Sequence, residues 1–275
     1  MAGEPPALVD LHLHPESLSD QDLETMRLFG LAAALVPAHR PMLEATSREL
    51  IAQFDEIVEV QLPRLERAGI RAYAALGVDP RCIPRRGLSE VLSALPSYFQ
   101  GGKVLALGVV GLHRAGEVEE EALVEQLALA RKLKLLVLVH TPVSEKARIT
   151  RRTLNVLRAS RIAPSSVMVD HAHSRTVRLI LECGHYAGLT IHPDETSGER
   201  ATALVRRLGS ERIVLDSGLG HGPGDILGLA RTASLMARAG LSRRVIARVA
   251  LKNAAEFLRI NLPSRSDRPT RSDRA

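Results

Sequence analysis

Short, continuous apolar runs alternate with longer amphipathic stretches along most of this 275-residue chain. Runs without polar alternation are typical of strands buried on both faces, as in a parallel sheet. Eight such runs occur, at residues 7–14, 31–39, 70–80, 103–113, 133–142, 166–173, 186–195 and 212–222. The amphipathic stretches have helical spacing, for example at residues 47–69, 119–133, 201–209, 224–240 and 242–260. The pattern therefore predicts strands and helices in alternation.

Eight strands that alternate with helices over about 250 residues are typical of an α/β fold, the (β/α)8 TIM barrel. We expect a single barrel domain over residues 1–262. A doubly wound open sheet is the alternative. No glycine-rich turn follows the first run, however, and the dinucleotide-binding members of that fold carry such a turn there.

The charge of the chain adds little about its partners. The net charge is +6, and most basic residues are arginine, which binds phosphate well. An arginine-rich, alanine-rich composition also arises in a high-GC genome without selection on the protein. Residues 263–275 repeat an "RSDR" unit and have no apolar residue beyond proline and the final alanine. We expect a disordered basic tail there, either simply solvated or in contact with nucleic acid.

The location of the protein follows from segments that the sequence lacks. No apolar run approaches the roughly 18 residues that a membrane span needs. The first residues lack the basic and apolar regions of a signal peptide. Cys82 and Cys183 lie far apart and fit free thiols in a reducing compartment. We therefore expect a cytoplasmic protein.

The histidines are not scattered along the chain. Of the ten, only His185 falls at the start of an apolar run. The others lie at or just after run ends: His12, His14, His39, His113, His140, His171, His173, His192 and His221. In a barrel, the carboxyl ends of the strands converge on one mouth, where the active site is built. The sequence therefore predicts an imidazole-rich site at that mouth.

His12 and His14 are separated by one residue at the end of the first run. Residues two apart in a strand face the same way, so both rings should point into the barrel mouth. Imidazole is the commonest ligand for zinc and related ions. With further histidines after the fifth and sixth runs, the pair predicts a divalent metal ion. We expect zinc, with manganese, iron or magnesium as alternatives.

Five stretches carry a family resemblance: "DLHLH" (10–14), "ALGVVGLHR" (106–114), "LVLVHTP" (136–142), "VMVDHAHS" (167–174) and "RIVLDSGLG" (212–220). They resemble the TatD-like branch of the metal-dependent amidohydrolase superfamily, over residues 8 to about 260. They look most like the TatD-related subgroup that includes the ebo-cluster, EboB-like hydrolases. The resemblance implies a metal-dependent hydrolase.

The resemblance also implies a two-metal centre. His12 and His14 would bind the first metal with an aspartate of the eighth strand, and His140 and His171 would bind the second. A glutamate on the fourth strand bridges the two metals in the family, but Val109 holds its position here. Two divalent ions about 3.5–4 Å apart repel each other, and the bridging carboxylate offsets that repulsion. We therefore expect a weakened two-metal centre or a mononuclear one.

The carboxylate of the eighth strand also departs from the family pattern. The resemblance places it at Gly218, whereas the chain has Asp216 two residues earlier. A mononuclear shell would comprise His12, His14, His140 and Asp216, with an open position for water. His171 or His173 would then be the proton shuttle, because imidazole titrates near neutral pH. Asp216, His171 and His173 are thus the expected catalytic residues.

The remaining polar residues at run ends are assigned more simply. Substrate contacts are expected from His39, His113, His192 and His221. Asp170 precedes His171 on the opposite face of its run and is interpreted as structural. Asp10 is expected to hydrogen-bond within the barrel end. Asp194 and Glu195 follow the seventh run and are candidate acids of a remodelled site.

Two functions remain open from the sequence. The first is a metal-dependent hydrolase that uses a metal-activated water on an ester, phosphodiester or amide bond. Its substrate would be a small molecule or a phosphodiester. TatD-like proteins are often described as deoxyribonucleases, and the basic charge would suit nucleic acid. The second is a barrel that has lost hydrolysis and binds a ligand or serves as an accessory protein of a biosynthetic cluster. Loss of the bridging carboxylate favours the second, and the retained histidines favour the first.

Overall fold

A computed structural model describes residues 7–39, 45–220 and 222–262. Its eight strands are β1 (Leu8–Asp10), β2 (Leu31–Pro37), β3 (Arg71–Leu76), β4 (Val104–Gly111), β5 (Leu136–His140), β6 (Val167–Val169), β7 (Tyr186–Thr190) and β8 (Ile213–Asp216). Each pairs in parallel with the next along the chain, in the order β1 to β8. This sequential order confirms the (β/α)8 barrel. It excludes the alternative, a doubly wound sheet, because the strand order of such a sheet reverses at a switch point.

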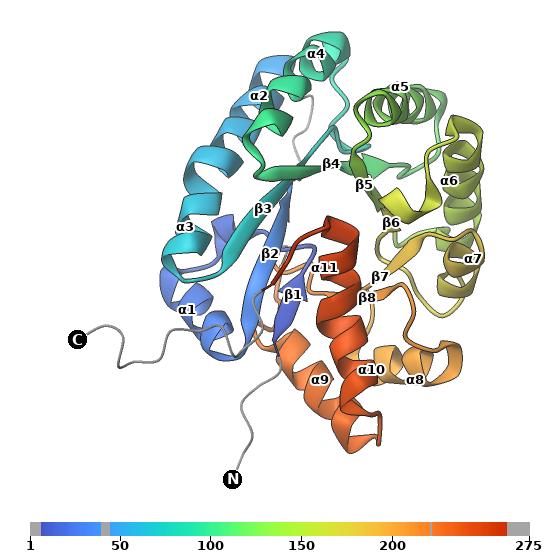
Figure 1. Ribbon diagram of the computed structural model, residues 1–275. Helices are drawn as coiled ribbons and strands as arrows, with labels where there is room; N and C mark the ends of the chain where they lie inside the picture. The colour runs from blue at the N-terminus through green and yellow to red at the C-terminus, as the bar shows by residue number, and fades with distance from the viewer. Residues whose placement is uncertain (1–6, 40–44, 221, 263–275) are drawn as a thin grey trace.

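Helices surround the strands on the outside (Figure 1). They are α1 (Asp20–Leu28), α2 (Ser47–Glu56), α3 (Leu62–Arg67), α4 (Leu88–Tyr98), α5 (Glu117–Leu133), α6 (Lys146–Ser160), α7 (Val177–Glu182), α8 (Gly198–Leu208), α9 (Gly228–Arg238), α10 (Arg243–Ala247) and α11 (Asn253–Leu258). The π-helical turns η2 (Ile57–Gln61) and η5 (Arg248–Lys252) join α2 to α3 and α10 to α11. Capping boxes fix where α1 and α2 begin, because Ser19 and Thr46 each exchange hydrogen bonds with an acidic residue three positions later.

Each strand lies inside one of the eight predicted runs but ends before the run does. At the site this matters for β1, which ends at Asp10, so that His12 and His14 lie beyond the strand. β6 likewise ends at Val169, before His171. The apolar composition of the runs does not mark these ends, because the first loop residues at the mouth are buried as deeply as the strands.

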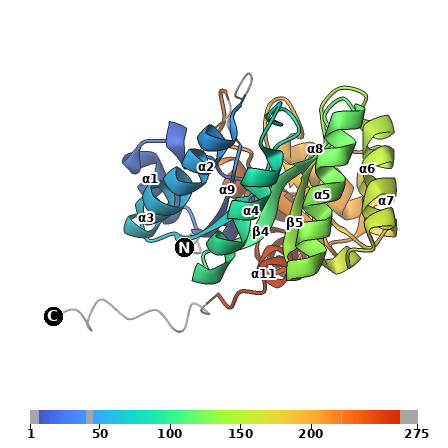
Figure 2. The ribbon, with the colours of Figure 1, turned by 90° about the horizontal axis from the view of Figure 1, so that it is seen from above.

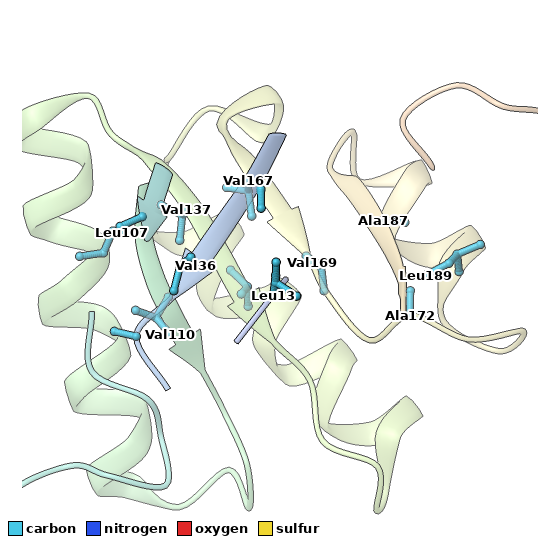
Figure 3. Packing of buried hydrophobic residues seen from close by; sticks show 14 of the residues in the cluster. Leu13, Val36, Leu107, Val110, Val137, Val167, Val169, Ala172, Ala187 and Leu189 are labelled. Atoms are coloured by element: carbon cyan, nitrogen blue, oxygen red, sulfur yellow. The ribbon is translucent and has the colours of Figure 1, made fainter. Parts of the chain in front are cut away.

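Two apolar layers follow from the alternation of side chains along each strand. On β5, Val137 and Val139 face outward and pack with the helices in the larger cluster. Figure 3 shows Val137 beside Val167 of the neighbouring strand in this layer. Leu136 and Leu138 face the opposite way and belong to a smaller cluster. That cluster takes residues from the inner faces of all eight strands and from α11, so it is the barrel interior. Its strand members include Val9, Ala33, Ala75, Ala106, Leu136, Met168, Tyr186 and Val214.

The barrel is closed at one end and open at the other. The ring of Phe257 in α11 packs 5.3 Å, between centroids, from Tyr186 at the start of β7. Figure 2 shows α11 beneath the strands, away from the loops that follow the strand ends. Beyond β1 and β8, Leu13 bridges Leu219 in parallel and completes the ring. Polar groups at the carboxyl ends of the strands are therefore left at the open mouth.

Three other expectations bear on the fold. In the described ranges, no helix is both long and apolar enough to cross a membrane. Cys82 and Cys183 are free thiols, as expected. The predicted basic tail, residues 263–275, and His221 lie outside the described residues.

Candidate metal centre

Strand alternation places several polar residues on the inner face at the mouth. His140 ends β5 and continues the inward series of Leu136 and Leu138. Asp216 ends β8 two residues after the inward Val214. Both polar side chains are almost fully buried. The barrel thus delivers an imidazole and a carboxylate from strands that are far apart in sequence to one end.

His12 and His14 converge although they lie beyond β1. Their Nε2 atoms are 2.9 Å apart. The loop that carries them is held by the buried carboxylate of Asp10, which accepts hydrogen bonds from the backbone N–H of His12 and of Ser217, both at 3.0 Å. Burial raises the pKa of Asp10 to about 6, against the opposing effect of these hydrogen bonds. Asp10 therefore ties the first histidine pair to the segment that follows β8.

Asp170 faces the site, so the prediction that it lies on the face away from His171 is wrong. Its Oδ2 contacts His12 Nδ1, and its Oδ1 accepts hydrogen bonds from His171 N at 2.7 Å and Thr190 Oγ1 at 3.2 Å. Asp170 continues the inward series of Met168. His171 also reaches the site because its backbone is left-handed, with φ of 56°. The prediction was wrong because it assumed that side chains keep alternating between the two faces beyond the end of β6, at Val169.

The rings of the predicted ligands form a connected group. The ring centroid of His12 lies 4.9 Å from that of His14 and 5.0 Å from that of His171. His171 in turn lies 5.2 Å from His140. His12, Asp170 and His171 each place a ligand atom within 4.8 Å of the others. Four histidines from three regions of the chain therefore meet around two carboxylates.

The protonation states favour metal binding. Burial lowers the pKa of His140 far below its ordinary value and that of His171 to about 3, so both rings are neutral, which is the ligating form. Burial alone would raise the pKa of Asp170, but the neighbouring His171 and His12 hold it well below its usual range. Burial, and then the charge of Asp170, raises the pKa of Asp216. A cation between the two carboxylates would relieve that repulsion.

Several buried polar atoms at the mouth lack a hydrogen bond. Within the described ranges, neither ring nitrogen of His140 and neither oxygen of Asp216 has a partner. Unsatisfied groups this deeply buried are rare and call for an explanation such as a bound ion. Two further contacts orient the ligands. Asp170 holds Nδ1 of His12, and Thr190 Oγ1 lies 2.9 Å from Nδ1 of His171, as outer partners of metal-bound imidazoles do. The residues present thus fit a divalent metal ion.

Gly188 on β7 makes room for the two carboxylates. A Cβ at this position would lie 2.3 Å from Asp170 Oδ1 and 2.8 Å from Asp216 Oδ2. No side chain can therefore occupy the inner face of β7 at this level. Sequence reasoning missed this glycine, since glycine inside a strand has several structural explanations.

Val109 lies in the inner apolar cluster and is 1% exposed. The fourth strand therefore offers an apolar side chain where the family resemblance implies a bridging glutamate. His113, four residues later, stacks on His140 with centroids 5.8 Å apart. Its backbone N–H donates to Glu119 Oε2 at 2.8 Å. This leaves His113 beside the metal group but not among its converging ligand atoms.

A buried ion pair supports His171 from outside. Lys146 Nζ donates to the backbone oxygen of His171 at 2.6 Å and to Glu195 Oε2 at 2.7 Å. The Lys146 side chain is only 3% exposed. Glu195, expected as an acid of a remodelled site, lies 3.9 Å from His171 Nδ1 through its other oxygen. Lys146 was missed because a lysine in a helix usually lies on the solvated face.

A second polar cluster lies beside the first. His39 Nδ1 lies 2.6 Å from Asp79 Oδ2, and the guanidinium of Arg81 grips the same carboxylate through Nε and Nη2, both at 3.0 Å. The ring of His39 is 5.6 Å from that of His14. Sequence reasoning included His39 but missed Asp79 and Arg81. The same rule of polar residues at run ends would have found Asp79, had it been applied to carboxylates.

The remaining predicted residues lie in local contacts. His173 Nδ1 accepts a hydrogen bond from Arg175 N at 3.2 Å. His192 Nδ1 lies 3.7 Å from Asp194, whose side chain is 80% exposed. These contacts do not bring either histidine into the converging group. Their proposed roles as proton shuttle and substrate contact stay predictions.

Known proteins resemble this chain over most of its length. The family of TatD-related DNases matches residues 9–219. An uncharacterized metal-dependent hydrolase from Methanocaldococcus jannaschii is 32% identical over 254 residues, which cover 92% of this chain and 100% of the relative.

Solved structures extend this comparison. A TatD-like protein from Archaeoglobus fulgidus has a TM-score of 0.77 and 27% identity, and the match covers 92% of this chain and all of the other. A phosphotriesterase homology protein from Escherichia coli, solved with phosphate in its active site, has a TM-score of 0.69 over 94% of this chain and all of its own. Its identity of 16% shows the shared fold alone.

Proposed function

Because the chain belongs to the family of TatD-related DNases, a family of metal-dependent hydrolases, we propose that it hydrolyses an ester, phosphodiester or amide bond at the mouth of its barrel. The observation that carries this proposal is the group of buried nitrogen and oxygen atoms without a hydrogen-bond partner. His140 and Asp216 have no hydrogen-bond partner in the part of the chain that the structure describes. The ring of His140 lies 5.2 Å from that of His171, and Asp216 and Asp170 both lie against Gly188. A divalent cation could be coordinated by the lone pairs of all these nitrogen and oxygen atoms at once.

The proposed ligands are His12, His14, His140, His171 and Asp216, with Asp170 in contact with the same group. A divalent ion bound there would polarise a water and the scissile bond. Zinc suits a site dominated by imidazole, and manganese, iron and magnesium are the alternatives. The chain holds these ligands on short loops after rigid strands, so little reorganisation is needed on binding.

Proton movement is assigned to groups at the same site. Asp216 has no competing hydrogen bond at either oxygen within the described residues, so its carboxylate can accept a proton from the attacking water. His173, or His171 where His12, His14, His140 and Asp216 alone hold the metal, would carry that proton onward to the leaving group. His39, His113, His192 and His221 are the proposed substrate contacts. Substrates are small molecules or phosphodiesters, nucleic acid among them.

We propose a mononuclear centre. Val109 is apolar and buried at the position where a bridging glutamate would stand. Glu195 cannot readily replace it, since Lys146 already binds one of its oxygens. Asp170 is the carboxylate that could take part of that role, and its contact with His12 Nδ1 would then have to change.

The test begins with protein purified without added metal. Elemental analysis should find about one divalent ion per chain. Hydrolysis of bis(p-nitrophenyl) phosphate, p-nitrophenyl acetate and an anilide should be lost after chelation and return with one of the four metals. His140→Ala should lose metal and activity together.

A matched control uses the other buried imidazole. His185 lies at the opposite end of the barrel, where its Nδ1 donates to Pro164 O at 3.1 Å. His185→Ala should keep its metal even if it is less stable. Wild-type metal content in His140→Ala would refute the proposed ligand set.

A second function is favoured by Val109. An apolar residue in place of the bridge fits a barrel that has lost hydrolysis and binds a ligand, as an accessory protein of the kind that the resemblance to ebo-cluster proteins implies. If the barrel only binds a ligand, no ester or amide tested should be hydrolysed, with or without metal. Chelator-sensitive hydrolysis by the wild type, absent in His140→Ala, would exclude it.

A further inference from the structure

In the cluster of His39, Asp79 and Arg81, the carboxylate of Asp79 binds both of the other side chains. Asp79 is 2% exposed, and both its oxygens are bound. Oδ1 accepts from the backbone N–H and Nε of Arg81, at 2.8 and 3.0 Å, while Oδ2 contacts Arg81 Nη2 and His39. Asp79 stays ionised, because His39 and Arg81 hold its pKa well below the ordinary value against the effect of burial. The carboxylate is thus fully engaged.

Arg81 is engaged on one edge only. Nε and Nη2 face Asp79, and Nη2 also lies 3.1 Å from His39. In the ranges that the structure describes, Nη1 makes no hydrogen bond, and the side chain is 32% exposed. A guanidinium fixed by one fork presents its other N–H groups in a defined direction, at little further entropic cost. Asp79 therefore acts as a support that leaves Nη1 available.

The charge of Arg81 acts across the mouth. It lowers the pKa of His39, after β2, and of His113, after β4, in addition to the effect of burial. Arg81 Nη2 lies 3.1 Å from His39, and the ring of His39 is 5.6 Å from that of His14 in the metal group. The cation of Arg81 is thus separated from the metal group by a single imidazole ring. The same positive charge would attract an anion bound at the metal group.

We propose that Arg81 determines specificity by binding a phosphoryl oxygen of the substrate through Nη1, so that the site favours anionic phosphate esters over neutral esters. This inference rests on the proposed hydrolase function and adds a residue that would determine its specificity. A charge-assisted hydrogen bond from a preoriented guanidinium to phosphate is among the stronger polar contacts in proteins. Asp79 is a positioning residue, since it acts through Arg81.

The experiment compares an anionic and a neutral substrate with the same leaving group. Arg81→Met should lower kcat/KM for bis(p-nitrophenyl) phosphate by about 10- to 100-fold, as expected for loss of hydrogen bonds to a charged group. It should lower kcat/KM for p-nitrophenyl acetate much less, and the metal content should stay at the wild-type level. Arg81→Lys, which keeps the charge but not the fork, should fall between the two. Arg67→Met, an exposed arginine at the closed end of the barrel, is the matched control.

Equal losses on both substrates would overturn the proposal, because they would mean that Arg81 only supports His39 and Asp79. Binding of inorganic phosphate, measured by calorimetry on metal-free protein, separates this inference from the proposed function. If the wild type held no metal and hydrolysed nothing, the hydrolase proposal would fail. Weaker phosphate binding by Arg81→Met would still support the anion site, and equal binding would refute it. If Arg81→Met does not fold, the same comparison is made with Arg81→Lys.

Discussion

Replacing Lys146 by methionine should lower the free energy of unfolding by about 3 kcal/mol. Methionine keeps the apolar stem but removes the ammonium, which donates to His171 O and to Glu195. Removing one partner of a buried ion pair costs about 3–5 kcal/mol, because the other charge remains buried. The lower end applies here, since the side chain of Glu195 is 13% exposed and water can partly solvate it.

The cost should depend on pH. Burial raises the pKa of Glu195, and Lys146 opposes that rise. A carboxyl group with a raised folded-state pKa favours the fold most below its unfolded value, and this contribution is lost as the pH rises through the folded value. Without Lys146 the pKa should rise further. The destabilisation should therefore be larger at about pH 8 than at about pH 5.

Urea unfolding of chelator-treated protein at both pH values measures these effects without a metal contribution. Lys103→Met is the control, because Lys103 pairs with Glu66 on the surface and exposed pairs contribute about 0–1 kcal/mol. Lys146→Met combined with Glu195→Gln should recover part of the loss, since no charge is left buried. If Lys146→Met costs no more than Lys103→Met at about pH 8, the reasoning about the buried pair is wrong.

Three further outcomes are expected. His12→Ala should strip the metal in elemental analysis, whereas His173→Ala should leave it bound, because His173 is engaged in its own loop; metal lost from both would contradict the ligand set. Val109→Glu should raise the metal content from about one ion toward two and increase hydrolysis of bis(p-nitrophenyl) phosphate; two tightly bound ions in the wild type would show that another residue already bridges. Deleting residues 263–275 should leave the melting temperature unchanged, since that sequence has almost no apolar surface to offset ordering entropy; a large drop would show that it docks on the barrel.

Much of the fold was determined by local sequence pattern. Continuous apolar runs mark strands buried on both faces, and eight of them in alternation with amphipathic helices leave few arrangements other than a closed parallel barrel. The barrel topology then sends every strand end to one mouth. That rule predicted that His12, His14 and His140 lie at the same end, while Asp216 came from the family resemblance. The structure has all four at the carboxyl ends of the strands.

Contacts between distant segments were decided only by the tertiary structure. His12 and Asp170 are 158 positions apart, and no periodicity links them until the barrel closes and brings the ends of β1 and β6 to one centre. The inward turn of His171 depends on a left-handed backbone that strand alternation does not predict. Arg81 and Lys146 are of residue types that usually lie on the solvated surface. Only the structure shows that Asp79 contacts Arg81 and that Glu195 contacts Lys146. Local periodicity fixes which way a side chain points, but the identity of its partner depends on how the strand ends pack together.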